Sequence, residues 1–447
     1  MISTAVIIAL LWEKFQTNPT ITGLDTDFHD WNVSFPAITL CMSNPYNKNL
    51  TDELSRNEDI SQLSEMLNED SCKILNRTGD QHDSSGLDCF SQILIHLAEI
   101  SYGNIDVFKE YTDSTLQDKN LRNICMKIYS HCEDIFKDCS WKGKEQGSCC
   151  FPNNPNGLKP LFTDHGFCYA FNSQKTEDIW PWISTVMKGG STLEIYETDD
   201  SWEFSFNVKD SIYFPIKVFI HDAMEVPAAE IQPQHEWDGR ISQLVFSAKT
   251  TYTTLGARQL SIGQRHCVFP DELQLQLDPE GYTYSGCLRQ CHADEAMRLC
   301  GCVPPFVNEI GHYKHCDLSG LACLAENREQ LIHCQSLSCE LGCLNTVYEV
   351  EKLSGSLLHE QYKPLHIGFV SWPMVRYKRE VLFGWVDLFV SFGGIAGLFL
   401  GFSLLSGVEI IYYLTLRVLC MVVLPSNLKR KKCAKSKRGP KSIGLKK

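Results

Sequence analysis

Near the C-terminal end of the sequence, three residues interrupt a long apolar run: Gly401, Phe402 and Ser403. The 21 residues from Leu388 to Val408 carry no formal charge. As a helix they match the roughly 30 Å hydrocarbon core of a bilayer. Glycine and serine at mid-membrane weaken such a helix and turn carbonyls and a hydroxyl toward water. Because these oxygens can replace the water shell of a small cation, the triplet predicts the narrow point of an ion pore.

Two acids, Asp387 and Glu409, bound this apolar run. Carboxylates so close to hydrocarbon are unfavourable unless they face water or a partner. We therefore expect Asp387 to attract cations at the outer mouth of the pore and Glu409 to do so at the inner one. The run also contains further small residues, which leave open a single-pass anchor that dimerises through a small-residue face: Gly393, Gly394, Gly397, Ser406 and Gly407.

His221 beside Asp222 is the other place where residue types suggest chemistry. A catalytic or metal site is one reading, but a turn and cap at the end of a strand is the commoner one, and no third ligand is evident. The sequence has no His-Glu-x-x-His, Gly-x-Ser-x-Gly or Cys-x-x-Cys motif. We expect neither an enzyme nor a metal or organic cofactor, and no nucleic-acid partner.

Nineteen of the 21 cysteines lie between Cys41 and Cys343. This density is typical of an oxidising compartment, so we expect residues 13–384 to be extracellular. Asn-x-Ser/Thr sequons there predict glycosylation at Asn32, Asn49 and Asn76.

The two ends of the chain differ in charge. Residues 13–384 contain 30 basic and 52 acidic residues, whereas 11 Lys and Arg and no acid follow Glu409. The acidic surface would either concentrate cations near a pore or only confer solubility. The basic segment 417–447 belongs in the cytoplasm by the positive-inside rule, as a topology signal or also through attraction to anionic lipid.

The N-terminal stretch Met1–Trp12 is apolar and uncharged. As a helix it covers only about 18 Å, so it is either part of a membrane helix or a signal peptide. No Lys or Arg precedes Lys14, which favours the partial helix.

Hydrophobic patterns give a coarse map of the elements between these ends. Helical spacing is present in Leu54–Leu67, Asp88–Ile100 and Tyr284–Cys300. Strands are expected at Phe35–Cys41, Gly166–Asn172, Trp202–Val208, Phe214–Asp222 and within Val347–Arg379. Cys287 and Cys291 lie four residues apart and so share one face of the last helix, where both can point at a second element.

The run from Gly393 to Tyr413 resembles the second membrane helix of the degenerin/epithelial sodium channel family, closest to its insect pickpocket branch. Segments 35–41, 166–172 and 214–222 and the cysteine spacing of 267–343 resemble the same family. The resemblance implies an α+β membrane protein in which two transmembrane helices flank a disulfide-rich extracellular domain of palm, finger, thumb and β-ball. The implied regions are a partial first helix (1–12), the extracellular domain (13–384, with finger 49–163 and thumb 267–343), the second helix and pore (385–416) and the cytoplasmic tail (417–447).

Function follows from the same resemblance. It implies a subunit of a trimeric, sodium-selective, amiloride-sensitive channel of the plasma membrane, alone or with related subunits, with sodium as the permeant ion. Gly401, Phe402 and Ser403 would form the selectivity filter, and Val390 with Ser391 would form the gating position. The printed sequence would begin inside the first membrane helix, without the family's His-Gly gating motif. The rival interpretation is a single-pass cysteine-rich receptor or adhesion protein.

The resemblance also implies disulfides. They are Cys41–Cys168, Cys139–Cys149, Cys267–Cys343, Cys287–Cys339, Cys291–Cys334, Cys300–Cys323 and Cys302–Cys316. Spacing alone leaves the connectivity open. Five cysteines remain, an odd number: Cys72, Cys89, Cys125, Cys132 and Cys150.

Overall fold

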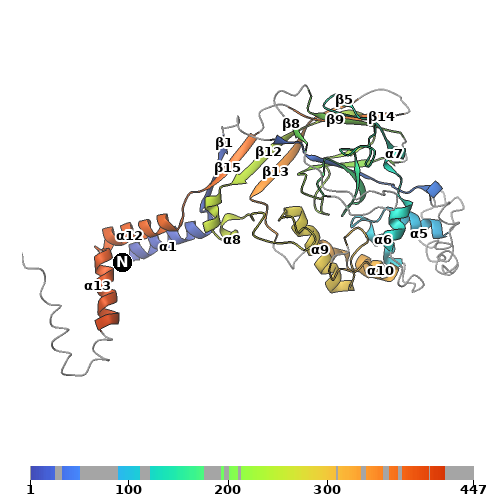
Figure 1. Cartoon of the computed structure of the whole chain (residues 1–447). Coiled ribbons are helices and arrows are strands. Elements are labelled where there is room, and N and C mark those ends of the chain that lie inside the picture. Colours follow the sequence, from blue (N-terminus) through green and yellow to red (C-terminus); the bar gives the residue numbers. More distant parts are fainter. Residues whose placement is uncertain are drawn as a thin grey trace, which may run out of the picture. The chain divides into compact units, whose positions relative to one another are not determined.

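The computed structural model of the chain describes residues 2–25, 33–50, 89–110, 121–175, 193–195, 201–209, 213–308, 311–333, 339–355, 362–370, 375–401 and 403–417 (Figure 1). The chain divides into two compact units. The small unit is Met1–Ile21, Thr254–Arg265 and Glu380–Lys447, and the large unit is Thr22–Thr253 and His266–Arg379.

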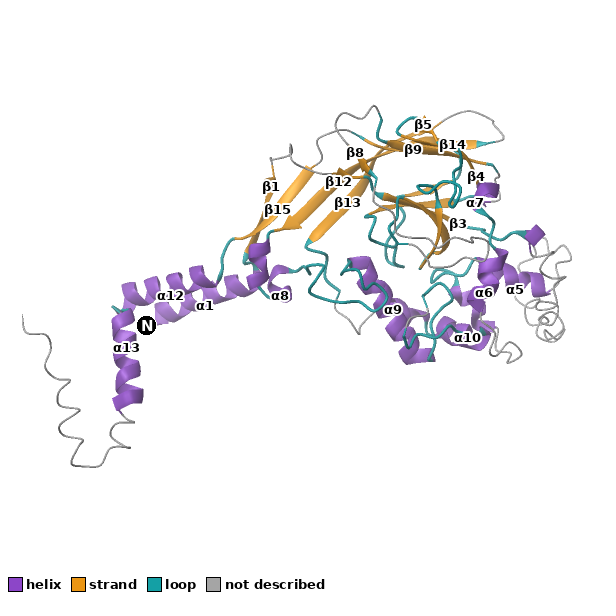
Figure 2. Cartoon of the chain, in the orientation of Figure 1, coloured by secondary structure: helices purple, strands orange, loops and turns teal. Residues whose placement is uncertain are grey.

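Two larger β-sheets and one short strand pair hold the described strands (Figure 2). The eight-stranded sheet has the order β1 (Thr20–Asp25), β15 (Val375–Val381), β12 (Ile241–Thr253), β14 (Lys363–Phe369), β9 (Glu203–Val208), β4 (Phe136–Trp141) and β5 (Lys144–Glu145), with β13 (Leu344–Gly355) paired to β12. The five-stranded sheet has the order β11 (His235–Trp237), β10 (Ile216–His221), β3 (Ala37–Met42), β7 (Gly166–Phe171) and β6 (Lys159–Thr163). The short pair is β2 (Val33–Ser34) with β8 (Glu194–Ile195).

Burial explains why these segments are strands. In β12, Leu244, Phe246 and Ala248 are buried and their neighbours are half-buried, which is the period-two pattern of a sheet with one covered face. Strands β3 and β7 are buried along their whole length, as expected of central strands covered on both faces. Five expected strand regions are thus confirmed by β3, β7, β9, β10 and the strands β13 to β15.

Aromatic rings fill the space between the two sheets. The ring of Phe171 on β7 stacks on that of Phe204 on β9, with centroids 3.8 Å apart. Phe35, fully buried, meets Trp141 edge-on at 4.5 Å and lies near Phe246 as well. Such contacts add to simple area burial, so this layer is the core of the large unit.

The helices of the large unit lie beside these sheets in the chain order α5 (Cys89–Ala98), η1 (Ile105–Glu110), α6 (Leu121–Ile128), α7 (Cys132–Ile135), α9 (Tyr284–Cys300), α10 (Leu318–Glu326) and α11 (Arg328–Ile332). The longest of these described helices, α9, has the bounds that its spacing predicted. The Thr283 hydroxyl accepts from the amide of Gly286 to start it, and Gly301 (φ 71°) ends it in the left-handed region.

One regional expectation differs from the structure. Within the finger range 49–163 the sequence predicted only helical segments, yet the last part of this range forms β4, β5 and β6. Trp141 and Phe162 point into the core from these strands, so tertiary burial outweighs local propensity. The predicted helix Asp88–Ile100 is present as α5, and Leu54–Leu67 lies outside the described residues.

The small unit is helical. It contains α1 (Ile2–Thr17), η4 (Leu255–Gln259), α8 (Ile262–Arg265), α12 (Trp385–Leu400), α13 (Leu404–Ile411) and η5 (Tyr412–Leu416). Helix α1 continues to Thr17, past the expected end of the apolar stretch at Trp12. The extension is explained by Phe15, which is fully buried and packs with Leu260 and Leu388.

Candidate pore segment

The apolar run from Leu388 to Val408 forms two helices, with the break at the triplet where the sequence predicted a weakened helix. Helix α12 ends at Leu400, and Gly401 follows with φ 61° and ψ 22°, a left-handed conformation that favours glycine. The amide of Gly401 donates to the carbonyl of Gly397, closing the last turn. The described chain resumes at Ser403, which starts α13. Phe402 lies outside the described residues.

Ser403 is the N-cap of α13. Its Oγ accepts from the backbone amide of Ser406 at 3.2 Å and lies 3.1 Å from the Ser406 hydroxyl. The N-cap bond satisfies an amide that has no partner inside the helix, so serine at this position favours a new helix over a continuous one. Ser403 remains exposed. The Gly-x-Ser triplet therefore produces a helix break with an exposed hydroxyl and a helix C-terminus.

Asp387 has a local structural partner. Its Oδ2 accepts from the amide of Gly384 at 2.9 Å in a capping arrangement at the start of α12. The carboxylate stays exposed, so the same group is also available to solvent cations. Val390 is 69% exposed, Ser391 is half-buried and Glu409, on α13, is exposed.

One face of α12 is packed and another is bare. Leu388 is 1% exposed because it lies against Phe15 of α1 and Leu260. The Phe15 ring also meets Trp385 edge-on, with centroids 4.7 Å apart. Elsewhere on the helix, Leu398 is 80% exposed. A Cβ added at Gly393 or Gly394 would meet nothing within 4 Å.

No single helix among the described residues has both the length and the apolar character needed to cross a membrane.

The structure pairs most of the expected cysteines. Six of the disulfides that the resemblance implied are present: Cys41–Cys168, Cys139–Cys149, Cys267–Cys343, Cys287–Cys339, Cys300–Cys323 and Cys302–Cys316. Cys291 is also disulfide-bonded, while Cys334 lies outside the described residues. Cys41 and Cys168 face each other in the β3–β7 register, which explains their pairing.

The cysteines without an expected partner are now partly placed. Cys132 is bonded to Cys150, and Cys125 is a buried free thiol whose Sγ lies 3.4 Å from the Leu97 carbonyl. Burial raises the pKa of the Cys125 thiol to about 12, so it stays protonated.

Of the predicted glycosylation positions, Asn49 is described and exposed. Asn32 and Asn76 lie outside the described residues.

The His221–Asp222 pair forms a turn and cap. His221 Nε2 lies 2.8 Å from the Thr39 hydroxyl, and its Nδ1 lies 2.8 Å from the Asp222 carbonyl oxygen. Asp222 Oδ1 accepts from the amide of Met224. Burial lowers the pKa of His221 to about 4, so the ring is neutral. Among the described residues no group of three or more His, Cys, Asp or Glu could hold a metal ion.

Sequence reasoning missed a buried charge cluster in the large unit. His292 on α9 lies between two carboxylates, with Nε2 2.8 Å from Glu230 Oε1 and Nδ1 3.3 Å from Asp164 Oδ2. Arg289 Nε donates to Asp164 Oδ1 at 3.2 Å. Burial alone would lower the pKa of His292, but the two carboxylates outweigh it and raise that pKa to about 9. The imidazolium is thus a fixed cation that joins α9 to the β6–β7 turn.

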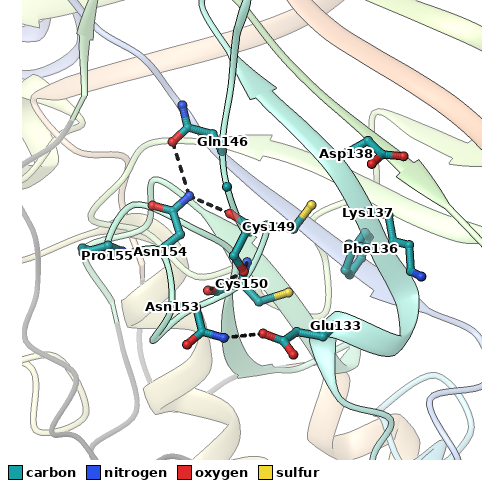
Figure 3. A pocket seen from close by; sticks show the side chains of 12 residues that line it. Glu133, Phe136, Lys137, Asp138, Gln146, Cys149, Cys150, Asn153, Asn154 and Pro155 are labelled. Atoms are coloured by element: carbon teal, nitrogen blue, oxygen red, sulfur yellow. Dashed lines mark hydrogen bonds between the residues drawn. The ribbon is translucent and has the colours of Figure 1, made fainter.

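An open hollow of about 690 Å³ lies between β4 and the loop of residues 146–155 (Figure 3). Its carboxylates are already bonded within the chain: Asn153 donates to Glu133, and Asn207 donates to Asp138. The hollow is therefore polar, and each of these two carboxylates already accepts a side-chain hydrogen bond within the chain.

Comparison with known proteins decides the family. A model of the amiloride-sensitive sodium channel family matches residues 1–413. The chain belongs to this family. It is 23% identical to sodium channel protein Nach of Drosophila ananassae over 478 aligned positions, covering 99% of this chain and 84% of that protein. It is 24% identical to pickpocket protein 11 of Drosophila melanogaster, covering 64% of this chain and 55% of that protein.

A vertebrate relative extends the comparison. The chain is 23% identical to the human bile acid-sensitive ion channel, covering 93% of this chain and 78% of that protein. The family consists of membrane ion channels, and the α+β fold with many disulfides fits the extracellular domain that the family implies. The resemblance read from the sequence is therefore confirmed.

Proposed function

We propose that this chain is one subunit of a trimeric, sodium-selective, amiloride-sensitive channel of the plasma membrane, built alone or with related subunits. The observation that carries this proposal is the helix break at Gly401–Ser403 in an otherwise apolar segment. Residues 1–12 and 385–416 would be the membrane segments, and 13–384 the extracellular domain, with finger 49–163 and thumb 267–343. The basic segment 417–447 would lie in the cytoplasm beside anionic lipid.

The helix break suits a cation. The last carbonyls of a helix have no partner within it, and its C-terminus carries a partial negative charge. Interrupted membrane helices use such C-termini and unwound carbonyls to coordinate sodium. The end of α12 and the Ser403 hydroxyl would supply these oxygens, with Phe402 completing the filter. Val390 and Ser391 would form the gate, and Asp387 and Glu409 would attract cations at the two mouths.

The bare face of α12 supports assembly. One segment cannot enclose a pore, so other copies must complete it. Because Gly393 and Gly394 have open space around them within one chain, a second helix could approach closely there. The packing of α1 on α12 through Phe15 and Trp385 favours two helices that act together over a lone anchor.

The test is whole-cell current from cells that express this chain alone or with related subunits. Gly401→Val should abolish most amiloride-sensitive sodium current or reduce the sodium to potassium permeability ratio several-fold at normal surface expression. Gly311→Val is the matched control, since Gly311 (φ 66°) is also left-handed with open space around it but lies in the large unit. Equal permeability ratios in wild type and Gly401→Val would refute the pore assignment.

A further inference from the structure

A small cavity of about 150 Å³ lies within the large unit. Its walls come from the loop after β10, the first turn of α9 and the start of β13. Apolar atoms dominate the lining, contributed by Met224, Pro270, Tyr282 and Leu344, and the carboxylate of Glu225 is among the polar groups. Ligand sites commonly combine such an apolar lining with a few placed polar groups.

The acids around this cavity differ in their partners. Glu280 is paired with Lys175, whose Nζ lies 2.8 Å from its Oε2. Asp222 accepts a backbone amide through Oδ1. The carboxylate of Glu225, in contrast, has neither a hydrogen bond nor an ion pair with any residue that the structure describes. Glu225 is thus a half-buried acid that has no counter-charge among the described residues, and a bound cation would supply one.

The electrostatics agree with the geometry. Burial, and then the charges of Asp222 and Asp278, raise the pKa of Glu225 to about 7. A strongly shifted acid in a cavity is a typical feature of a functional site. A cation bound there would restore an ordinary carboxylate.

Two disulfides fix the cavity walls in advance. Cys267–Cys343 ties the strand that enters the wall at Leu344 to the chain segment before Pro270. Cys287–Cys339 anchors the first turn of α9. Because the walls are held covalently, little order needs to be gained on binding, which favours affinity for a small ligand.

We propose that this cavity is a binding site for a small organic cation, with one ammonium group paired to Glu225 and an apolar body against Met224 and Leu344. An organic ion fits better than a metal ion, because no cluster of three or more His, Cys, Asp or Glu side chains in the described part of the chain could hold a metal. The bound cation would contact the loop after β10, the first turn of α9 and the start of β13. It would therefore hold these three elements together. The site stands whether or not the chain conducts.

The test is equilibrium binding of tritiated phenethylamine to the full chain purified in detergent, with 2-phenylethanol as the uncharged competitor and Gly-Lys-Gly as a peptide carrying the same ammonium group. We expect phenethylamine or the peptide to bind, and the alcohol to compete at least tenfold more weakly. If unlabelled phenethylamine displaces the tritiated probe and the peptide does not, the ligand is a free amine. If the peptide also displaces the probe, the ligand can be a lysine side chain.

Three variants separate charge from shape. Glu225→Gln should weaken binding at least tenfold and should leave the unfolding midpoint unchanged or higher, because it removes a half-buried charge that has no counter-charge. Leu344→Trp should occlude the cavity with the carboxylate intact. Glu280→Gln, whose charge is already paired with Lys175, should change affinity less than threefold. Equal binding of the alcohol, full binding by both Glu225→Gln and Leu344→Trp, or no binding of either ammonium probe would overturn the proposal.

Discussion

The two units of the chain differ in how firmly their long helices are held by other residues of the same chain. In the large unit, α9 is capped at both ends, anchored by disulfides at Cys287 and Cys300 and pinned by the buried His292 cation. In the small unit, α12 is packed along one face only, and residues such as Leu398 and Val390 are largely exposed. The large unit is therefore specified within one chain, whereas the small unit leaves apolar side chains of α12 uncovered by its own described residues.

The largest effect should come from a pair of matched truncations. Phe204→Ala removes a ring stacked in the core and should lower the free energy of unfolding by about 3–5 kcal/mol. Phe389→Ala removes the same ring from α12, where Phe389 is 68% exposed, and should change stability little. Thermal unfolding of the two purified variants measures the contrast. Similar losses in both would show that α12 is packed within its own chain.

The buried cation gives a pH test. The folded pKa of His292 is raised to about 9, above the ordinary value of 6.5. Protonated His292 therefore contributes its full amount, about 3 kcal/mol, to the free energy of unfolding below about pH 6.5. This contribution is lost as the pH rises through 9. Wild-type stability should fall between pH 7 and pH 9.5.

His292→Gln is the comparison for this fall in stability. It should be less stable at pH 7 and should show a shallower decline on the alkaline side. Unfolding midpoints across this pH range report both quantities. Parallel curves for the two proteins would mean that His292 is neutral in the folded state.

The gating assignment predicts an effect on current. Tryptophan at Val390, or a cysteine at Ser391 modified by a bulky thiol reagent, should raise basal sodium current several-fold by blocking closure of the gate. Val386→Trp is the control, because Val386 is equally exposed one turn earlier on α12. Currents are recorded before and after reagent, at matched surface expression. If Val386→Trp raises current as much, bulk on α12 rather than a gate position is responsible.

The smallest expected effect concerns the cap of α13. Ser403→Ala removes the N-cap oxygen, a loss of about 1 kcal/mol of helix stability, and should reduce the sodium to potassium permeability ratio about twofold to fivefold. Ser403→Thr should preserve both. Ser406→Ala keeps the cap bond, because that bond comes from the Ser406 backbone amide. An unchanged sodium to potassium permeability ratio in Ser403→Ala would mean that the Ser403 hydroxyl does not contribute to selectivity.

Sequence and structure agree where the determinants are local. The spacing from Tyr284 to Cys300 predicted α9 because caps and periodicity lie within one segment. The Gly-x-Ser triplet similarly signals the helix break. The charge cluster could not be read from the sequence, because Asp164 and His292 are 128 residues apart and meet only through the fold. Glu225 gave no signal either, since its lack of a partner is a property of three converging segments.

The small unit also contains residues 254–265, which interrupt the large unit in the sequence. Within the small unit, Leu260 is 2% exposed because Phe15 and Leu388 cover it. A recombinant fragment spanning residues 22–379 would keep Leu260 but lose both covering residues. This bared apolar surface would promote aggregation during purification. Soluble fragments for antibody production or crystallisation should therefore replace Leu260 with a polar residue or shorten the 254–265 segment.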